Sequence, residues 1–428
     1  MQIHVVTRND SLFSIANTYG STVQAIIEAN EIDAPNQLVI GQALVIPIVG
    51  QFHFVQPGES LYSIARQYGT TAARLAQINN IPADQPLRVG LRLYIPPRPK
   101  TTIRSIAYVE PRGNTVSATL ENAARKAAPY LTHLLPFSYR VNRDGSLSAP
   151  PLGNLRSIAQ ARDATLTMVV SNLESGQFSG EIAHIVLTVQ AVQDRLLDNI
   201  VNTAQREGFR GVNFDFEFLL PGDREAYNRF LRRAKTRFSS AGLQLSTTLA
   251  PKISGTQTGQ GHEAHDYRAH GEIANYSLIM TYEWGNAAGQ PRAVSPINEV
   301  RRVIDYALTV MPASKILLGQ NLYGYDWTLP QQPSVLAKAL SPQQAIALAR
   351  RENAIIQYDT RQQAPFFNYT DSAGRRHEVW FEDARSIQAK FNLIRERNLR
   401  GIGYWKLGLA FPQNWLLLGD EFTIAKNE

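Results

Sequence analysis

Residues 2–97 contain an internal repeat with a constant shift of 49 positions. The matching pairs include His4 and His53, Ser11 and Ser60, Tyr19 and Tyr68, Asn30 and Asn79, and Gly41 and Gly90. A repeat of about 50 residues corresponds to one supersecondary unit. The N-terminal part of the chain must therefore fold into two small modules of one architecture.

Each unit has the pattern of a strand, two helices and a second strand. In the first unit, Ser11 is placed to cap the first helix, and apolar residues then recur at helical spacing. Asn30 closes the second helix, and Gly41 turns the chain into a short strand that Pro47 ends. The second unit repeats these signals, so we expect two βααβ modules.

The two units resemble LysM modules, with expected boundaries at residues 1–48 and 50–97. The signal is specific because many positions recur in the same order twice. The resemblance implies binding of N-acetylglucosamine units of peptidoglycan or chitin through the loops after the first strand and after the second helix. These loops are residues 7–10 with 31–33, and residues 56–59 with 81–83. The Pro-rich segment 96–100 is expected to be a stiff linker.

From residue 102 onward, apolar strand patterns alternate with helical patterns. The candidate strands are residues 103–109, 131–138, 165–171, 211–217, 244–250, 276–282, 316–322 and 401–406. Eight strands with intervening helices predict an α/β fold, a (β/α)₈ TIM barrel over residues 102–428. At about residues 355–381, aromatic runs and a turn interrupt the alternation and predict a small α+β insertion with antiparallel strands.

The strand at residues 211–218 alternates strictly between apolar and polar side chains. The apolar residues are expected to face the helices; they are Val212, Phe214, Phe216 and Phe218. The polar residues Asn213, Asp215 and Glu217 are expected to point inward. Two carboxylates inside a parallel barrel are costly unless they are paired, hydrogen-bonded or used in chemistry. Their mutual repulsion would raise one pKa and give an acid beside an ionised group. The alternative is an antiparallel strand with its polar face in water.

The segment from Arg210 to Glu217 is similar to the signature of family-18 glycoside hydrolases, Asp-Gly-x-Asp-x-Asp-x-Glu. Gly211, Asp215 and Glu217 match, whereas Arg210 and Asn213 replace the two earlier aspartates. Asn213 puts in doubt the proton shuffling that a full row of aspartates is thought to allow. Met280-Thr281-Tyr282-Glu283 resembles the family's Met-x-Tyr-Asp strand with Glu for Asp, and residues 319–324 resemble its seventh strand. Trp405 fits the aromatic residue that ends the eighth strand.

The resemblance implies substrate-assisted catalysis with retention of configuration. Glu217 would protonate the glycosidic oxygen, and the substrate's 2-acetamido oxygen would attack C1. Asp215 would hold the acetamido N–H, Tyr282 would orient the acetamido oxygen, and Trp405 would form an apolar floor for the sugar. The substrate must then carry an N-acetylated amino sugar at the cleaved position.

Further residues are candidates for substrate binding, with plain packing as the equally weighted alternative at the strand ends. The substrate-binding candidates are Asn213, Trp284, Gln320, Tyr323, Phe137 and Glu283, and the other cleft candidates are Tyr108, Glu110, Ser138, Asp326 and Trp327. The segment with His262, His265, Asp266 and His270 lacks the spacing of a His-Glu-x-x-His metal helix. We therefore expect no metal site and no cofactor.

Composition excludes several classes of protein. The chain has no cysteine, so disulfides and thiolate chemistry are ruled out. No run of five basic residues occurs despite a net charge of +7, which disfavours nucleic-acid binding. The sequence contains no stretch of 18 apolar residues, so no membrane span is predicted. The N-terminal sequence shows no signal-peptide pattern.

Two LysM-like units before this barrel resemble the spore cortex-lytic N-acetylglucosaminidases of the SleL or YaaH type. The resemblance implies a peptidoglycan hydrolase that acts on cortex fragments during germination. It also implies a location at the boundary of spore coat and cortex, with coat proteins as possible neighbours and the cell wall as the alternative. The rival interpretations are a chitinase-like hydrolase, a lectin that has lost hydrolysis, and a structural coat protein. Retention of Asp215, Glu217 and Tyr282 argues against the lectin.

Overall fold

The computed structural model describes residues 1–332 and 334–427. Within this range, eight parallel strands close into a ring in which the last strand pairs with the first. They are β5 (Thr101–Val109), β6 (His133–Pro136), β9 (Thr165–Ser171), β12 (Gly211–Asp215), β13 (Gln244–Leu249), β14 (Tyr276–Ile279), β15 (Ile316–Asn321) and β21 (Gly401–Trp405). The predicted TIM barrel is confirmed, and its strands follow the predicted order.

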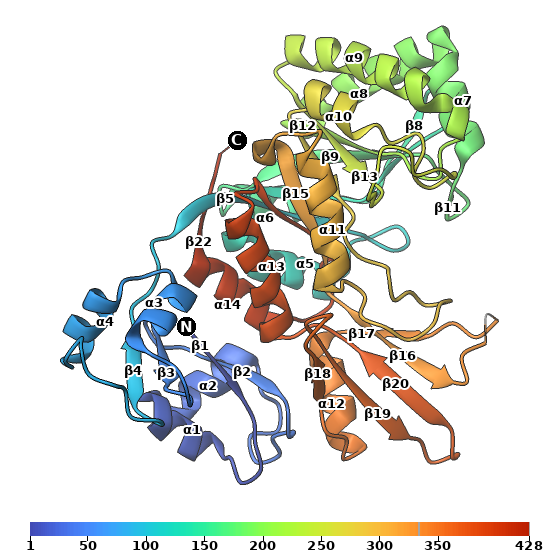
Figure 1. Cartoon of the computed structure of the whole chain (residues 1–428). Coiled ribbons are helices and arrows are strands. Elements are labelled where there is room, and N and C mark those ends of the chain that lie inside the picture. Colours follow the sequence, from blue (N-terminus) through green and yellow to red (C-terminus); the bar gives the residue numbers. More distant parts are fainter. Residues whose placement is uncertain (333, 428) are drawn as a thin grey trace.

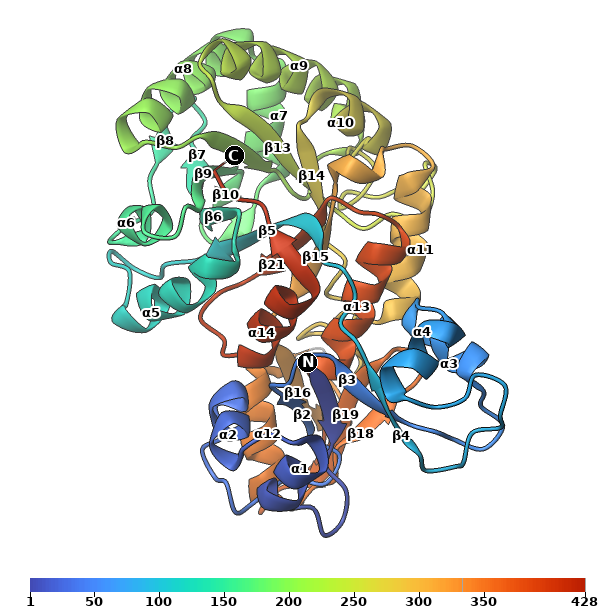
Figure 2. The ribbon, with the colours of Figure 1, turned by 90° about the vertical axis from the view of Figure 1, so that its left-hand side faces the viewer.

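Helices surround the ring and cover its apolar outer face (Figures 1 and 2). They are α5 (Ala118–Ala127), α6 (Leu155–Gln160), α7 (Gly180–Thr188), α8 (Gln190–Glu207), α9 (Arg224–Ser240), α10 (Tyr267–Ile273), α11 (Ile297–Leu308), α13 (Ala384–Glu396) and α14 (Pro412–Glu421). Val212 and Phe214 of β12 and Phe216 just after it are buried, and the Phe214 ring lies 5.1 Å from that of Phe230 on α9. None of the described helices is both long and apolar enough to cross a membrane.

An antiparallel sheet with one helix is inserted between β15 and α13. Its elements are β16 (Gly324–Leu329), β17 (Lys338–Leu340), α12 (Pro342–Arg351), β18 (Gln357–Asp359), β19 (Ala364–Thr370) and β20 (Arg376–Trp380). The insertion therefore begins about thirty residues before the segment expected from the sequence. Only two residues separate β15 from β16. In the sequence, the aromatic residues of β16 therefore resemble a loop that follows a barrel strand.

Each repeat forms the expected βααβ module. The first contains β1 (Gln2–Val5), α1 (Leu12–Tyr19), α2 (Val23–Asn30) and β2 (Ala43–Ile46), and the second contains β3 (Gln51–Phe54), α3 (Leu61–Tyr68), α4 (Ala72–Asn79) and β4 (Arg92–Ile95). Ser11 and Ser60 both form capping boxes at the start of the first helix. The amide of Asn30 bonds the backbone of Val45 on β2 in both directions, at 2.8 Å each, which explains why this asparagine recurs.

The first repeat is docked on the barrel and its insertion. Arg350 of α12 donates two hydrogen bonds to the carboxylate of Asp33, at 2.8 and 2.7 Å. The backbone N–H of Ile356 donates to the carbonyl of Ile40 at 3.0 Å, and Val39 is buried in the core of the insertion. The segment after α2, including the predicted glycan loop at residues 31–33, therefore makes one edge of a domain interface. Gln413 of α14 adds a bond to the carbonyl of Ala43 at 2.9 Å.

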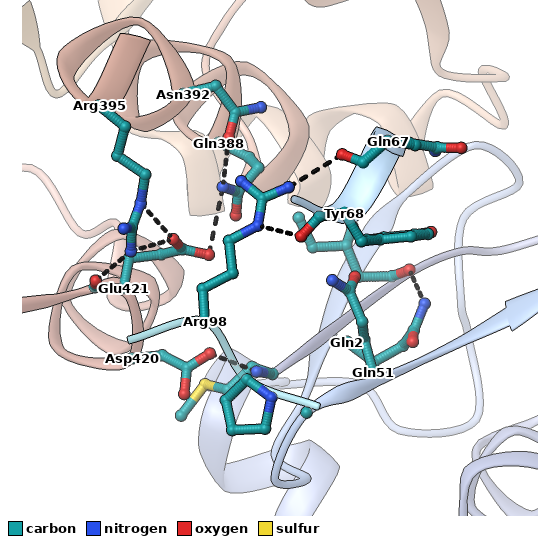
Figure 3. A pocket seen from close by; sticks show the side chains of 14 residues that line it. Gln2, Gln51, Gln67, Tyr68, Arg98, Gln388, Asn392, Arg395, Asp420 and Glu421 are labelled. Atoms are coloured by element: carbon teal, nitrogen blue, oxygen red, sulfur yellow. Dashed lines mark hydrogen bonds and ion pairs between the residues drawn. The ribbon is translucent and has the colours of Figure 1, made fainter. Parts of the chain in front are cut away.

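The second repeat contacts the barrel less directly. Phe52 and Phe54 of β3 pack against the core of the first repeat. A polar cavity of about 250 Å³ lies where both repeats, the linker, α13 and α14 meet (Figure 3). There Arg98 of the linker donates to the carbonyl of Tyr68 at 2.8 Å, and the N-terminal amino group pairs with Asp420. The cavity therefore lies at the interface between the two repeats and the barrel.

The two repeats offer a matched pair of glycines for testing the dock. Gly41 and Gly90 both have left-handed φ angles, +85° and +83°, so alanine strains the backbone at either site. A Cβ on Gly41 would lie 1.8 Å from the carbonyl oxygen of Ile356, whereas a Cβ on Gly90 meets nothing within 4 Å. We expect Gly41→Ala to lower the free energy of unfolding by about 2 kcal/mol more than Gly90→Ala, measured by urea denaturation. Equal losses would contradict a tight dock.

Candidate active site

Two carboxyl groups lie at the carboxyl end of β12, inside the ring. Asp215 is the last residue of the strand and is buried, and Glu217 follows two positions later and is half-buried. Because Phe214 and Phe216 pack outward, the residues that alternate with them face the barrel interior. This is the end of the barrel at which enzymes with this fold carry their catalytic groups.

Asn172 holds the backbone of Glu217 in place. The regular pairing of β9 with β12 ends where Ser171 lies opposite Asp215. Beyond it, the amide of Asn172 accepts from the N–H of Glu217 at 2.9 Å and donates to its carbonyl at 2.8 Å. The Asn172 side chain thus extends the hydrogen-bond ladder between the two strands by one residue. It holds the backbone of Glu217 in place beyond the end of β12.

A network of neutral groups lies beneath Asp215. The amide oxygen of Asn213 accepts from the hydroxyls of Tyr108 and Thr248, at 3.1 and 3.0 Å, and its NH₂ donates to Ser246 at 3.1 Å. Asn213 is fully buried, and both ends of its amide are engaged by hydrogen bonds within the protein. An aspartate could not donate to Ser246 in this way, which gives a local reason for asparagine here.

The two carboxyl groups have raised pKa values. Burial raises the pKa of Asp215, and the neighbouring hydroxyl of Thr248 lowers it in part. Burial, and then the charge of Asp215, raise the pKa of Glu217 well above its usual range. Because the charge of Asp215 opposes the ionisation of Glu217, Asp215 is the first of the two to lose its proton and Glu217 keeps its proton to higher pH.

Tyr282 lies close to both carboxyls. Burial raises the pKa of its phenol well above the usual range, and the charges of Asp215 and Glu217 add to the shift, so the hydroxyl stays protonated. Gly319 of β15 provides the space for this ring, because a Cβ there would lie 3.0 Å from a ring carbon of Tyr282 and 2.4 Å from the carbonyl of Ile279. The site thus contains one neutral hydrogen-bond donor beside an acid and a carboxylate.

An aromatic floor lies next to these groups. The ring of Trp405, at the end of β21, is met edge-on by Phe137 at 4.9 Å and by Tyr108 at 5.6 Å between ring centroids. Lys406 follows on the chain, lies 5.3 Å from the Trp405 ring centroid and forms an ion pair with Glu110. Phe137 therefore supports the floor, with little surface of its own exposed.

A second group of side chains surrounds Glu283. The hydroxyls of Tyr323 and Tyr325 both donate to one carboxylate oxygen of Glu283, the latter at 3.1 Å. Tyr323 also packs with Tyr282 in one cluster. Tyr325 belongs to β16, so the insertion contributes a side chain to this part of the site. Glu283 and Tyr323, both predicted from the sequence, lie together here.

Other sequence-predicted residues are engaged in contacts within the protein. Trp327 is fully buried in the insertion, and Asp326 accepts from Tyr369 there, at 2.8 Å, so both belong to the insertion's own core. Gln320 is buried within β15, and Trp284 packs against the main core of the barrel. Ser138 bonds to the hydroxyl of Ser171, at 2.6 Å.

The histidine-rich segment is used inside the fold. His265 accepts from the backbone N–H at the end of β13 at 2.8 Å, and its other ring nitrogen donates to a carbonyl beyond β12 at 2.9 Å. Burial lowers the pKa of His265 to about 4 and that of His270 to about 3, so both are neutral. Asp266 caps α10 and pairs with Arg224. Within residues 1–332 and 334–427, no group of three or more His, Asp or Glu side chains is arranged to hold a metal ion.

Three residues of the site were not predicted from the sequence. Asn172 is a polar residue directly after a buried strand, which is a signal that could have identified it. Lys406 directly follows Trp405, and a single lysine at the end of a strand carries no pattern of its own. Tyr325 belongs to an element whose start was not recognised, so its place beside Glu283 had no sequence signal.

Comparison with known proteins identifies two kinds of domain in the chain. The model of "Glycosyl hydrolases family 18" matches residues 104–410. The model of the "LysM domain" matches residues 4–47 and 53–96.

Full-length relatives are also found. The chain is 65% identical over 427 residues to a "Cortical fragment-lytic enzyme" of Bacillus subtilis (strain 168), covering 100% of this chain and 99% of the relative. The crystal structure of the Bacillus megaterium QM B1551 spore cortex-lytic enzyme SleL is 51% identical and superposes with a TM-score of 0.90, covering 99% of each chain. The Bacillus cereus spore cortex-lytic enzyme SleL is 47% identical with a TM-score of 0.93, covering 100% of this chain and 99% of the other.

Proposed function

The chain belongs to glycosyl hydrolase family 18 and carries two LysM domains, and from this premise and its full-length relatives we propose that it hydrolyses the glycan of the spore cortex. The enzyme cleaves after N-acetylglucosamine by substrate-assisted catalysis with retention of configuration. The observation that carries this proposal is the pair of carboxyl groups at the end of β12, which both have raised pKa values, beside a neutral tyrosine.

Glu217 acts as the general acid in the first step. Its raised pKa keeps the proton on the carboxyl group until the glycosidic oxygen accepts it. The bond between C1 and that oxygen breaks, and the 2-acetamido oxygen of the substrate attacks C1 to give an oxazolinium ion. In the second step Glu217 removes a proton from water, which attacks C1 and restores the acetamido group.

Asp215 and Tyr282 act on the acetamido group. The ionised Asp215 accepts a hydrogen bond from the acetamido N–H and stabilises the positive charge of the oxazolinium ion. The neutral hydroxyl of Tyr282 donates to the acetamido oxygen and sets its approach to C1. Trp405 supports the apolar face of the sugar ring. A sugar without an N-acetyl group offers no internal nucleophile, so the site selects N-acetylated substrate.

The repeats attach the enzyme to its polymer. The first repeat has a surface hollow of about 460 Å³ between residues 7–13 and residues 35–40. The hollow is open, although the segment after α2 that lines it also contacts the barrel and its insertion. Binding at two modules and in the cleft raises the effective concentration of enzyme on an insoluble glycan. The protein acts at the spore cortex, and we place it at the boundary of coat and cortex, next to coat proteins.

The products of cortex digestion test this mechanism. We expect fragments that end in a reducing N-acetylglucosamine, identified by mass spectrometry, with the β anomer formed first in a time course followed by NMR. A thiazoline analogue of the oxazolinium ion should inhibit, because it resembles the intermediate. First-formed α anomer, or a reducing muramic unit, would contradict the proposal.

A further inference from the structure

A groove of about 620 Å³ lies between the first repeat and the flank of the barrel. Helix α2 of the repeat forms one wall, and α5 and α14 of the barrel form the other (Figure 2). Lys126 of α5 pairs with Glu31 at 2.6 Å, and Gln413 of α14 donates to Asn30 at 2.7 Å, so polar contacts join the two walls. The groove shares no lining residue with the surface hollow of the repeat. It is therefore a separate surface, and it exists only because the repeat is docked.

The lining of the groove combines aromatic rings with separate hydrogen-bonding groups. The rings of Tyr130 and Trp415 are stacked, 6.2 Å apart between centroids and tilted by 26°, and both are half-buried there. Thr119, Asn122 and Lys126 are exposed and follow one another at helical spacing along α5, so they line the same side. A sugar ring has apolar C–H faces and hydroxyl groups at its edge, so a surface of this kind suits it.

The loop at residues 407–411 connects the groove with the cleft. This loop follows Trp405 and leads into α14. Leu409 lines the groove, and it also packs against the cluster that contains Tyr282 and Tyr323. One side chain thus contacts both the groove and the residues around the acetamido site. A glycan strand that leaves the cleft over this loop would enter the groove.

The positions of the acid and the floor indicate which part of the strand takes this path. Glu217 follows β12 and Trp405 ends β21, and these strands are four places apart in the ring of eight, so they lie on opposite sides of the barrel. The acid protonates the oxygen of the unit that leaves. The units that stay attached to the sugar on Trp405 therefore extend away from Glu217, toward the loop after β21 and the groove.

We propose that this groove binds further sugar units of the same glycan strand, on the side that the enzyme retains in the first step. The inference rests on the proposed function, because that function sets the direction of the strand in the cleft. The groove has three charged side chains, Glu28, Glu31 and Lys126, of which the last two are paired. Its net charge is therefore not positive, which favours uncharged sugar rings over the acidic peptides that the glycan carries.

The test measures kcat/KM on cortex glycan of two lengths, from which the peptides have been removed with an amidase. Tetrasaccharides fill the cleft only, whereas long fragments also reach the groove. Ala123→Leu narrows the groove, because Ala123 is a half-buried lining residue of α5, and Tyr130→Leu removes one ring of the stack. We expect each variant to lose about tenfold in kcat/KM on the long fragments. On tetrasaccharides, kcat/KM should stay within about twofold of the wild type.

Ala118→Leu is the matched control, because it makes the same change at an exposed position of α5 that does not line the groove. It should retain the rates on both lengths. Equal losses on both lengths, or no loss on the long fragments, would overturn the groove as a sugar site. A loss in Ala123→Leu alone would mean that the repeat has been displaced, and a loss seen only on fragments that keep their peptides would mean that the groove binds peptide. Either result would also overturn the proposal, whereas a wild-type enzyme inactive on both lengths would refute the proposed function itself.

Discussion

Glu217→Gln is expected to abolish turnover of cortex fragments while folding and glycan binding persist. Glutamine has almost the same shape but carries no proton that can be given to the glycosidic oxygen. The loss in kcat should be on the order of 10²–10⁴, as for other general acids. The measurement is kcat on muropeptide fragments, with urea denaturation to check that the fold is intact.

The matched control is Glu272→Gln. Glu272 is an exposed residue of α10, so the substitution removes one negative charge without touching the cleft. Its activity should equal that of the wild type. A fully active Glu217→Gln enzyme would end the assignment of the acid, whatever the control does.

Asp215→Asn should lower kcat by about 10²–10³, because the group that stabilises the developing positive charge is gone. It should also change the pH dependence. The charge of Asp215 raises the pKa of Glu217, so its removal lets Glu217 lose its proton at lower pH. The alkaline limb of the pH–rate profile should therefore move to lower pH.

The profile of log kcat against pH measures this shift for both enzymes. An unchanged alkaline limb in Asp215→Asn would show that the two carboxyls do not interact. A shift to higher pH would mean that Asp215 acts on Glu217 in some way other than by its charge.

The barrel was predictable because its strands are short, buried runs of apolar residues separated by amphipathic helices. The same regularity identified Asp215 and Glu217, since polar residues that alternate on a buried strand break the expected pattern. The repeats were predictable for a different reason, because each structural signal occurs twice. Trp405 and Tyr282 came from resemblance to a family and not from any property of the residues themselves.

Contacts between distant segments had no signal in the sequence. The bonds from Arg350 to Asp33 and from Gln413 to Ala43 join residues more than 300 positions apart. Alternation placed Phe218 under the helices, and this prediction was wrong, because its ring is 51% exposed. The strand ends at Asp215, and the Asn172 side chain then continues its hydrogen-bond ladder. Alternation predicts orientation only as long as the backbone stays extended.

The dock of the first repeat bears on the lengths of the fragments that the enzyme releases. A glycan strand that lies in the hollow of this repeat and in the cleft at once would span a distance set by the protein, because Arg350, Ile356 and Gln413 fix the repeat on the barrel. A repeat on a flexible tether would allow many spans and a broad range of products. With the fixed repeat, cuts made while both sites are filled would fall at a constant number of sugar units from the held end.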